Sequence, residues 1–370
     1  MKPKILYLME YPIDLPGGAQ LSTRAICDPL SKEGEYEIVV VCPELLKSKK
    51  SDYAFRVETY PMGEKRLPNL RLRIKAFREI IAAEKPSLIH IEMSESLITY
   101  GFIRRHFPLL PYIYTDRGMY FGYRLRSRLF MMPVLKRAAA LVTTTEKNAT
   151  LWREHTAIRP VETIPNTISP LFETFEPEKK KTSGKLVIGF AGRVCEEKDW
   201  DAVPELVREL KKAGIDFFVD LVLSVFEPGD AEVVEKLCGG LREIMGAENF
   251  RYRQDLSQEE MSDYYYGVDL FVMTSRFESF GKAAVEAMSR KCAVLATAVG
   301  GLPEVVGKEE ALYDKEEPSG FVEAVRRFAG DREALMKEQS FFLERYRSLY
   351  KSDRYVSRHK ELYKRILGGA

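Results

Sequence analysis

The chain has 370 residues, of which 45% are hydrophobic and 30% are charged, and its formal net charge is only +2. This composition is typical of a folded protein of about two domains and argues against a disordered chain. The sequence has no apolar run close to the roughly 20 residues that cross a bilayer, and so small a net charge gives no reason to expect nucleic acid as a partner.

Residues 1–170 alternate short apolar runs with helical patterns. The expected strands are 5–9, 38–42, 88–92, 112–115 and 140–144, and helical patterns lie between them, notably over 19–32, 70–84 and 124–137. The first run indicates a buried strand and not a signal peptide. The alternation predicts a doubly wound α/β domain with a parallel sheet.

Two glycines, Gly17 and Gly18, follow the first predicted strand and open the first predicted helix. Glycine lets the backbone approach a ligand closely, and the N–H groups at a helix start suit an anion. The pair is therefore a candidate ligand contact, although any tight turn after a strand produces the same pattern.

The stretch 101–137 is basic and partly apolar. It holds eight Lys or Arg residues against one acid, Asp116, and aromatic and aliphatic residues lie between them. Such a mixture suits an anionic membrane surface or a phosphorylated acceptor. A solvated basic helix with its apolar side in the core explains the pattern equally well.

Residues 171–184 are expected to link two domains, because Glu, Pro, Lys, Ser and Gly dominate from Glu173 to Gly184. A second α/β domain is expected over 185–345, with strands at 186–191, 217–223, 250–252, 270–274 and 294–297. Apolar spacing over 346–366 indicates one terminal helix within 346–370.

One βαβ unit, from Asp269 to Thr297, carries two glutamates, Glu278 and Glu286, around a loop-to-helix junction. Ligands of such sheets lie outside the carboxyl ends of the strands. Backbone N–H groups at the helix start suit phosphate, and those expected here belong to Phe280, Gly281, Lys282 and Ala283. The two carboxylates suit hydroxyl groups, since they accept hydrogen bonds. For isolated glutamates, a solvated loop and helix face would be the simpler interpretation.

Residues 278–288, ESFGKAAVEAM, resemble the E-x7-E signature of the retaining glycosyltransferases of family 4, and GGLPEVV at 300–306 continues the likeness. Gly192, Arg193 and Lys198 resemble the G-R-x4-K element of the same family. The resemblance implies the GT-B fold, with two Rossmann-like domains facing across a cleft and a C-terminal helix that returns to the first domain.

The resemblance also implies roles for individual residues. Arg193 and Lys198 would hold the donor diphosphate, Glu278 the hydroxyls of the transferred sugar, and Glu286 the ribose. The family's first glycine loop corresponds to Gly17 and Gly18. Arg offers a planar fork to phosphate oxygens and Lys a compact charge, which suits a reaction that expels a diphosphate.

The sequence departs from the family at several positions. Family members often have a histidine after the strand that corresponds to 112–115, but Asp116 and Arg117 stand here, so Arg117, or less readily Asp116, would contact the sugar. Asp199 and Asp201 match a metal-binding pattern of other glycosyltransferases. Because they open a predicted helix at 202–212, we interpret them as helix-start residues and expect no metal.

The sequence thus predicts a retaining hexosyltransferase of polysaccharide biosynthesis that uses a nucleotide-diphosphate sugar, with UDP favoured, and no metal or other cofactor. A glycan or lipid-linked glycan is the expected acceptor. Five scattered cysteines indicate a reduced, cytoplasmic protein, with 101–137 on the inner face of the plasma membrane. Two alternatives remain: a nucleotide-sugar epimerase of the same fold, and a catalytically silent nucleotide-binding partner in a glycan assembly complex.

Overall fold

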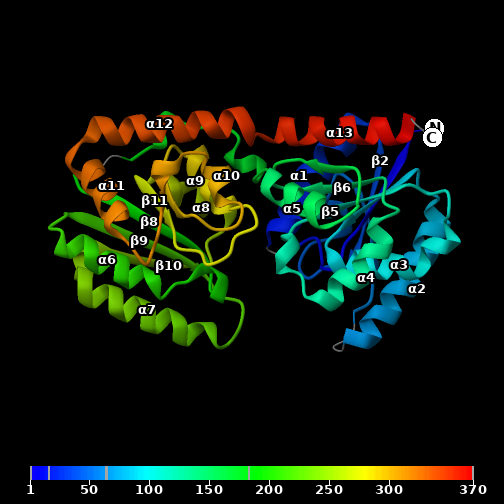
Figure 1. The fold of residues 1–370 in the computed structure, drawn as a ribbon, viewed down its shortest axis with the longest axis horizontal. Helices are drawn as coiled ribbons and strands as arrows, with labels where there is room; N and C mark the ends of the chain where they lie inside the picture. The colour runs from blue at the N-terminus through cyan, green and yellow to red at the C-terminus, as the bar shows by residue number, and fades with distance from the viewer. Residues whose placement is uncertain (1, 16, 63–65, 182–183, 369–370) are drawn as a thin grey trace. The chain divides into compact units, whose positions relative to one another are not determined.

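The computed structural model describes residues 2–15, 17–62, 66–181 and 184–368 (Figure 1). The chain forms two compact units. Unit 1 comprises Met1–Thr167 and Ser352–Ala370, and unit 2 comprises Ile168–Lys351. Within the described ranges, no helix combines the length and the apolar content that a membrane span requires.

Unit 1 contains a seven-stranded sheet in the order β3-β2-β1-β4-β5-β6-β7, in which every neighbouring pair is parallel. The strands alternate with helices along the chain, so each connection crosses over a face of the sheet. The strands are β1 (Lys4–Leu8), β2 (Glu37–Pro43), β3 (Arg56–Tyr60), β4 (Leu88–Glu92), β5 (Tyr112–Asp116), β6 (Ala140–Thr143) and β7 (Val161–Thr163).

Helices cover both faces of this sheet (Figure 1). One apolar core joins the sheet to α1 (Gly18–Glu33) and α13 (Ser352–Gly368), through residues such as Ile26 and Tyr363. A second core joins the opposite face to α2 (Arg66–Glu84), α3 (Ser94–Ile103), α4 (Leu125–Leu135) and α5 (Glu146–His155). The last helix of the chain is therefore part of the first unit.

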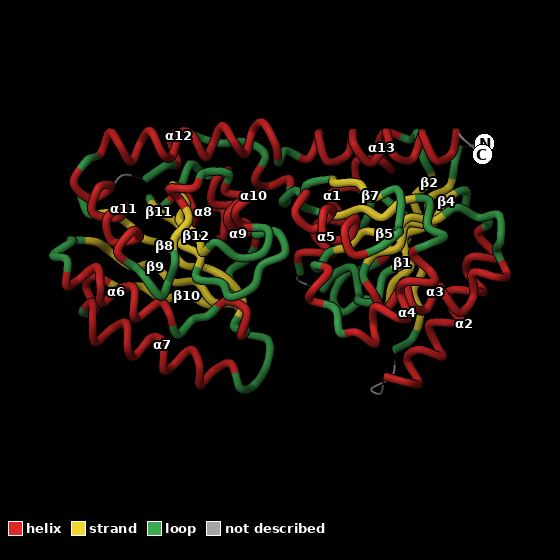
Figure 2. Tube along the Cα trace, viewed as in Figure 1, coloured by secondary structure: helices red, strands yellow, loops and turns green. Residues whose placement is uncertain are grey.

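Unit 2 contains a six-stranded sheet in the order β10-β9-β8-β11-β12-β13, again with parallel neighbours (Figure 2). One apolar core joins this sheet to its helices. The strands are β8 (Leu186–Arg193), β9 (Phe217–Ser224), β10 (Phe250–Gln254), β11 (Leu270–Met273), β12 (Ala293–Thr297) and β13 (Leu312–Tyr313). The helices are α6 (Ala202–Lys212), α7 (Asp230–Met245), α8 (Gln258–Tyr266), α9 (Lys282–Ser289), α10 (Leu302–Val306), α11 (Ser319–Gly330) and α12 (Arg332–Leu349).

The predicted fold class, two doubly wound α/β domains with a C-terminal helix on the first, is confirmed. The three strands that the sequence did not predict are β3, β7 and β13. The expected helix over 346–366 is wrong in one respect, since the chain breaks at Tyr350 and Lys351 into α12 and α13.

The expected linker over 171–184 also differs from the structure. The units divide between Thr167 and Ile168, so this segment belongs to unit 2. Phe172 is fully buried in the core of unit 2, and the backbone N–H of Glu176 donates to the Tyr266 hydroxyl at 2.8 Å. Phe172 and Phe175, whose ring stacks on that of Tyr266, therefore anchor this otherwise polar stretch in unit 2.

Candidate active site at the carboxyl edge of the second sheet

The strand order of unit 2 reverses between β8 and β11. From β8 the chain moves outward to β9 and β10, whereas from β11 it moves the other way to β12 and β13. Loops that leave the carboxyl ends of two such strands diverge and leave a crevice, which is where doubly wound sheets bind ligands. The loops here are 194–201 after β8 and 274–281 after β11.

These two loops bring Lys198 and Glu278 into contact. The ammonium nitrogen of Lys198 donates to a Glu278 carboxylate oxygen at 2.5 Å. Both side chains keep part of their surface accessible, 19% for Lys198 and 17% for Glu278. The sequence predicted both residues for the site, on different parts of a donor, and the structure brings them together.

Backbone contacts hold the two loops against each other. The Thr274 hydroxyl donates to the Lys198 carbonyl at 2.8 Å, and the Arg276 N–H donates to the Glu197 carbonyl at the same distance. Since both bonds end on main-chain carbonyls of the loop after β8, the positions of Lys198 and Glu278 are fixed by the fold and not by their own ion pair alone.

Glycines fix the backbone of Glu278 from the other side. Gly300 has φ +54°, and a Cβ there would lie 1.8 Å from the Glu278 carbonyl oxygen. That oxygen accepts a hydrogen bond from Gly301 at 2.9 Å. Gly281 has φ +101°, and its Cβ would lie 2.6 Å from Leu302. The sequence treated Gly300 and Gly301 only as a continuation of the motif, whereas the structure makes them the support of Glu278.

Helix α9 begins at Lys282 as predicted, with Gly281 in the left-handed conformation before it. The first hydrogen bond into the helix runs from Ala284 N–H to the Gly281 carbonyl. Phe280 points its side chain into the core, where its ring meets that of Tyr350. Only its backbone is therefore suited to the predicted phosphate contact, which Gly281, Lys282 and Ala283 would share.

Glu286 lies on α9 and is largely buried. The Tyr265 hydroxyl of α8 donates to its carboxylate at 3.2 Å. Burial raises the pKa of Glu286 to about 7, although the cations of Lys282 and Lys198 act in the opposite direction. Tyr265 was not predicted as a site residue, and the run of three tyrosines that contains it carries no functional signal.

Arg193 ends strand β8 with an exposed side chain. Its carbonyl accepts a hydrogen bond from the Trp200 indole N–H at 2.9 Å, which closes the loop 194–199 over the strand end. A guanidinium that is exposed at this edge can reach a bound anion.

The aspartates of the metal-like pattern have other partners. Asp199 is buried and pairs with Arg276 at 2.6 Å and with Lys315. Asp201 pairs with Lys236 at 3.2 Å. Asp201 stands at the N-cap position of α6, as predicted for a helix-start residue, but its side chain makes no capping hydrogen bond. Among the described residues, no group of three or more His, Cys, Asp or Glu side chains could hold a metal ion.

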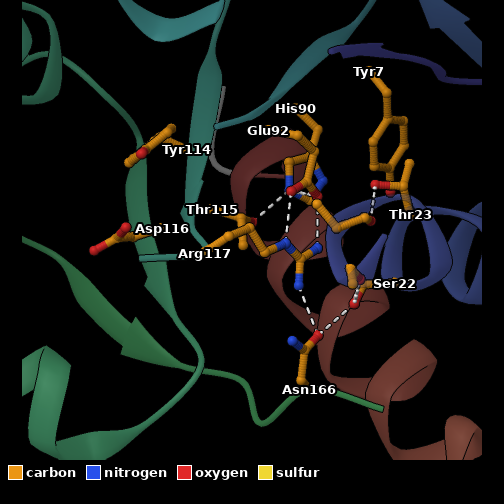
Figure 3. A network of polar contacts seen from close by, with 12 residues as sticks. Tyr7, Ser22, Thr23, His90, Glu92, Tyr114, Thr115, Asp116, Arg117 and Asn166 are labelled. Carbon is orange, nitrogen blue, oxygen red and sulfur yellow. Dashed lines mark hydrogen bonds and ion pairs between the residues drawn. The ribbon is translucent and has the colours of Figure 1, made fainter. Parts of the chain in front are cut away.

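In unit 1, Arg117 lies inside a buried polar network (Figure 3). Its guanidinium donates twice to Glu92, both at 2.8 Å, once to Asn166 and once to the Tyr355 hydroxyl. Burial disfavours the charge of Arg117, but the Glu92 carboxylate outweighs this and raises its pKa. These contacts engage the guanidinium within unit 1, and the sugar contact of Arg117 stays a prediction.

Asp116 points to the other side of β5 from Arg117 (Figure 3). It is fully buried, and its carboxylate accepts hydrogen bonds from Trp152, Asn148, Tyr123 and the Gly118 N–H. Both oxygens are thus engaged within unit 1, and the alternative sugar contact through Asp116 has no support from this geometry.

Two further sequence predictions fall in unit 1. Gly17 precedes α1 with an extended backbone, and a Cβ there would lie 2.5 Å from the Gln20 side chain. Gly18 is the first residue of the helix and is exposed. Asn166, next to the division between the units, accepts from Ser22 at 2.8 Å and from Arg117 at 2.7 Å.

Both halves of the chain match known family models. Residues 16–170 match the model described as Glycosyltransferase Family 4, and residues 172–340 match the model described as Glycosyl transferases group 1. Together the two models account for most of the chain, and the point between them lies close to the division between the structural units.

Individual relatives match over shorter regions. A 2-deoxystreptamine glucosyltransferase of Streptomyces kanamyceticus is 32% identical over 185 residues, which is 47% of this chain and 46% of that protein. A D-inositol 3-phosphate glycosyltransferase of Streptomyces avermitilis is 37% identical over 87 residues, 23% of this chain and 19% of that protein. The matches thus span less than half of these curated relatives.

Solved structures resemble the whole chain in fold. Sucrose-phosphate synthase of Thermosynechococcus elongatus superposes with a TM-score of 0.85 at 17% identity and covers 100% of both chains. The Anabaena protein HepE, solved in complex with UDP and glucose, has a TM-score of 0.80 at 16% identity and covers 98% of this chain and 99% of its own. At such identities the likeness concerns the fold alone.

Proposed function

The chain belongs to the glycosyltransferases of the GT-B fold, with a family 4 half followed by a group 1 half, and we propose that the protein moves a hexose from a UDP-sugar to a glycan or lipid-linked glycan acceptor with retention of configuration. The observation that carries this proposal is the contact between Lys198 and Glu278 at the strand-order reversal of unit 2. A cation for phosphate and a carboxylate for hydroxyls lie side by side there, as a sugar diphosphate requires.

Each part of the proposed donor has its own binding groups in unit 2. The diphosphate lies on Lys198, Arg193 and the N–H groups at the start of α9, where the helix dipole favours an anion. Glu278 accepts hydrogen bonds from the transferred sugar. Glu286 accepts hydrogen bonds from the ribose, a role that its hydrogen bond from Tyr265 supports by fixing the carboxylate.

The chemistry is a displacement at the anomeric carbon. The bond from this carbon to the diphosphate oxygen breaks while the acceptor oxygen bonds on the same face, and the leaving phosphate takes the acceptor's proton. Negative charge grows on the leaving oxygen, so fixed cations at Lys198 and Arg193 stabilise the transition state more than the ground state. Glu278 holds the sugar in the reactive position, and no enzyme nucleophile or metal is needed.

The first test is thermal unfolding with UDP, GDP and ADP and their common sugars, on wild type and on Lys198→Ala. A ligand bound only by the folded protein raises the melting temperature, so a shift with UDP that Lys198→Ala abolishes is expected. Lys212→Ala, an exposed lysine on α6, is the matched control and keeps the shift. A shift that survives in Lys198→Ala would contradict the phosphate site.

A second test separates transfer from the alternatives. Turnover of UDP-sugar is followed by release of UDP with a panel of glycan and lipid-linked acceptors, with and without EDTA. Acceptor-dependent release that survives EDTA is expected. Epimerised nucleotide sugar without any acceptor would indicate an epimerase, and binding without turnover on any acceptor would indicate a silent partner.

A further inference from the structure

Helix α4 of unit 1 exposes a row of large apolar side chains. Leu125, Leu129 and Phe130 are 66%, 64% and 61% exposed, and Phe121 in the turn before the helix is 62% exposed. Single exposed apolar residues are normal on a protein surface, but four within ten residues of one another are not. We call these four residues, with Arg124 and Arg126, the α4 face.

The α4 face is the outer side of a helix whose inner side is well packed. Met131, Val134 and Leu135 are buried in the core beneath the sheet. On the outer side, Leu125 and Leu129 are one turn apart, as are Arg126 and Phe130, so they form two adjacent columns. The exposure therefore does not come from a loose helix, since the same turns that expose Leu129 and Phe130 bury Met131 and Val134.

The charged side chains of α4 and its two ends are all cationic. Arg124 and Arg126 are exposed and form no ion pair with any residue that the structure describes, and Lys136 and Arg137 are exposed at the other end of the helix. Arg128 differs, since its guanidinium lies 4.9 Å from the centre of the Tyr120 ring. Residues 117–145 contain no Asp or Glu at all, so no carboxylate of this segment neutralises the arginines.

We propose that the α4 face docks on an anionic lipid bilayer, with Phe121, Leu125, Leu129 and Phe130 in the acyl boundary and Arg124 and Arg126 among the phosphate headgroups. A helix that lies in the interface presents this combination of apolar and cationic side chains, and each cation near an anionic surface adds to binding. Neutral apolar partners would leave the arginines without counter-charges.

A second copy of the chain fits the same face less well. A symmetric contact would bring Arg124 and Arg126 of both copies together, and like charges repel. Four side chains also provide far less than the roughly 800 Å² per partner that stable protein interfaces bury. A bilayer has neither difficulty, because it supplies both the negative charge and an apolar layer of any size.

The experiment is flotation of the full chain with vesicles of phosphatidylglycerol and phosphatidylcholine mixed, and of phosphatidylcholine alone, at low and high salt. We expect flotation with the anionic vesicles only, reduced by salt because screening weakens the headgroup contacts. Equal flotation with neutral vesicles, or none with anionic vesicles, would overturn the proposal.

Variants locate the contact. Leu125→Ser/Leu129→Ser/Phe130→Ser is expected to lower vesicle affinity at least tenfold, and Arg124→Gln/Arg126→Gln by about fivefold for each arginine. Matched controls with similar exposure elsewhere, Leu46→Ser/Met336→Ser and Arg208→Gln/Arg326→Gln, keep wild-type flotation. All the changed side chains are exposed, so the fold is retained.

The docking of the α4 face on a bilayer does not depend on the proposed glycosyl transfer. Failure of one can therefore be told apart from failure of the other. Turnover with a soluble acceptor is expected to be the same in wild type and in the triple serine variant. Light scattering on the same samples tests self-association: a wild-type dimer that the triple variant dissociates, without vesicle binding, would assign the α4 face to a second copy and overturn the lipid assignment.

Discussion

The Lys198 ammonium nitrogen lies 2.5 Å from the Glu278 carboxylate, although the two residues are 80 positions apart. In the proposed complex the lysine also faces the donor phosphates, so Glu278 shares its cation with the ligand. The pair is partly accessible, and pairs of this kind add at most about 1 kcal/mol to stability. The main effect of the ion pair is therefore to position Lys198 and Glu278, and it adds little to the stability of the fold.

Replacing Glu278 by Gln should separate sugar binding from nucleotide binding. The amide keeps the shape but loses the charge that accepts the sugar hydroxyls, so turnover is expected to fall by about 100-fold or more. UDP lacks the transferred sugar that Glu278 would hold, so its thermal shift should remain. The control Glu235→Gln, exposed on α7, should leave both quantities unchanged, and wild-type turnover in Glu278→Gln would contradict the assigned role.

A methyl group at Gly300 should destabilise unit 2. In Gly300→Ala the Cβ would lie 1.8 Å from the Glu278 carbonyl oxygen, at a backbone φ of +54°, so the turn must move. The expected loss is about 2–4 kcal/mol of unfolding free energy, measured by urea titration. In Gly239→Ala, inside α7 with open space around it, Ala instead favours the helix by up to about 1 kcal/mol.

Glu286 should make stability depend on pH. Its pKa is about 7 in the folded protein and near 4.5 when unfolded, so the folded state binds more protons between these values. Stability relative to Glu286→Gln therefore falls as pH rises from about 4.5 to about 7, by up to roughly 3 kcal/mol, and is constant above. Urea titrations of both proteins across pH 4.5–8 test this, and a difference that does not change with pH would contradict it.

Replacing Arg117 should lower the stability of unit 1 and leave the donor site of unit 2 intact. Arg117→Met leaves the Glu92 carboxylate buried without its partner, at a cost of about 3–5 kcal/mol. Adding Glu92→Gln should restore part of the loss. Urea titration measures the stability, with exposed Arg126→Met as the control. Unchanged stability together with lost turnover would instead return Arg117 to the sugar.

Local sequence was sufficient for most of the fold. Strands with continuous apolar runs, such as β2 and β11, could be predicted because strands that are buried on both faces are mostly apolar. The missed strands are polar or very short: β3 reads RVETY, β7 has three residues and β13 two. The break before α13 follows from Ser352 and Asp353, which favour a helix start, but the apolar spacing of 346–366 continues across it and hides it.

The candidate site likewise contains residues that local sequence predicts and contacts that it does not predict. The residues of the loop after β11 and of the start of α9 could be predicted because they are close in sequence. The partners of Arg117 come from β4, from Asn166 and from α13, so no local pattern reveals that this arginine is already engaged. Likewise, Gly300 and Tyr265 support the two glutamates through contacts that only the folded chain creates.

The division of unit 1 into two segments of the chain affects how the protein folds during synthesis. Unit 2 is continuous, so all its strands and helices have been synthesised once the chain reaches Lys351. Unit 1 begins first but lacks α13, whose Tyr363 hydroxyl meets that of Tyr7 at 2.5 Å. Until residues 352–368 emerge, the apolar face around Ile5 and Ile26 stays uncovered. The domain that is translated first is therefore completed last, and the nascent chain carries an exposed sheet face from the end of β7 until α13 has been made.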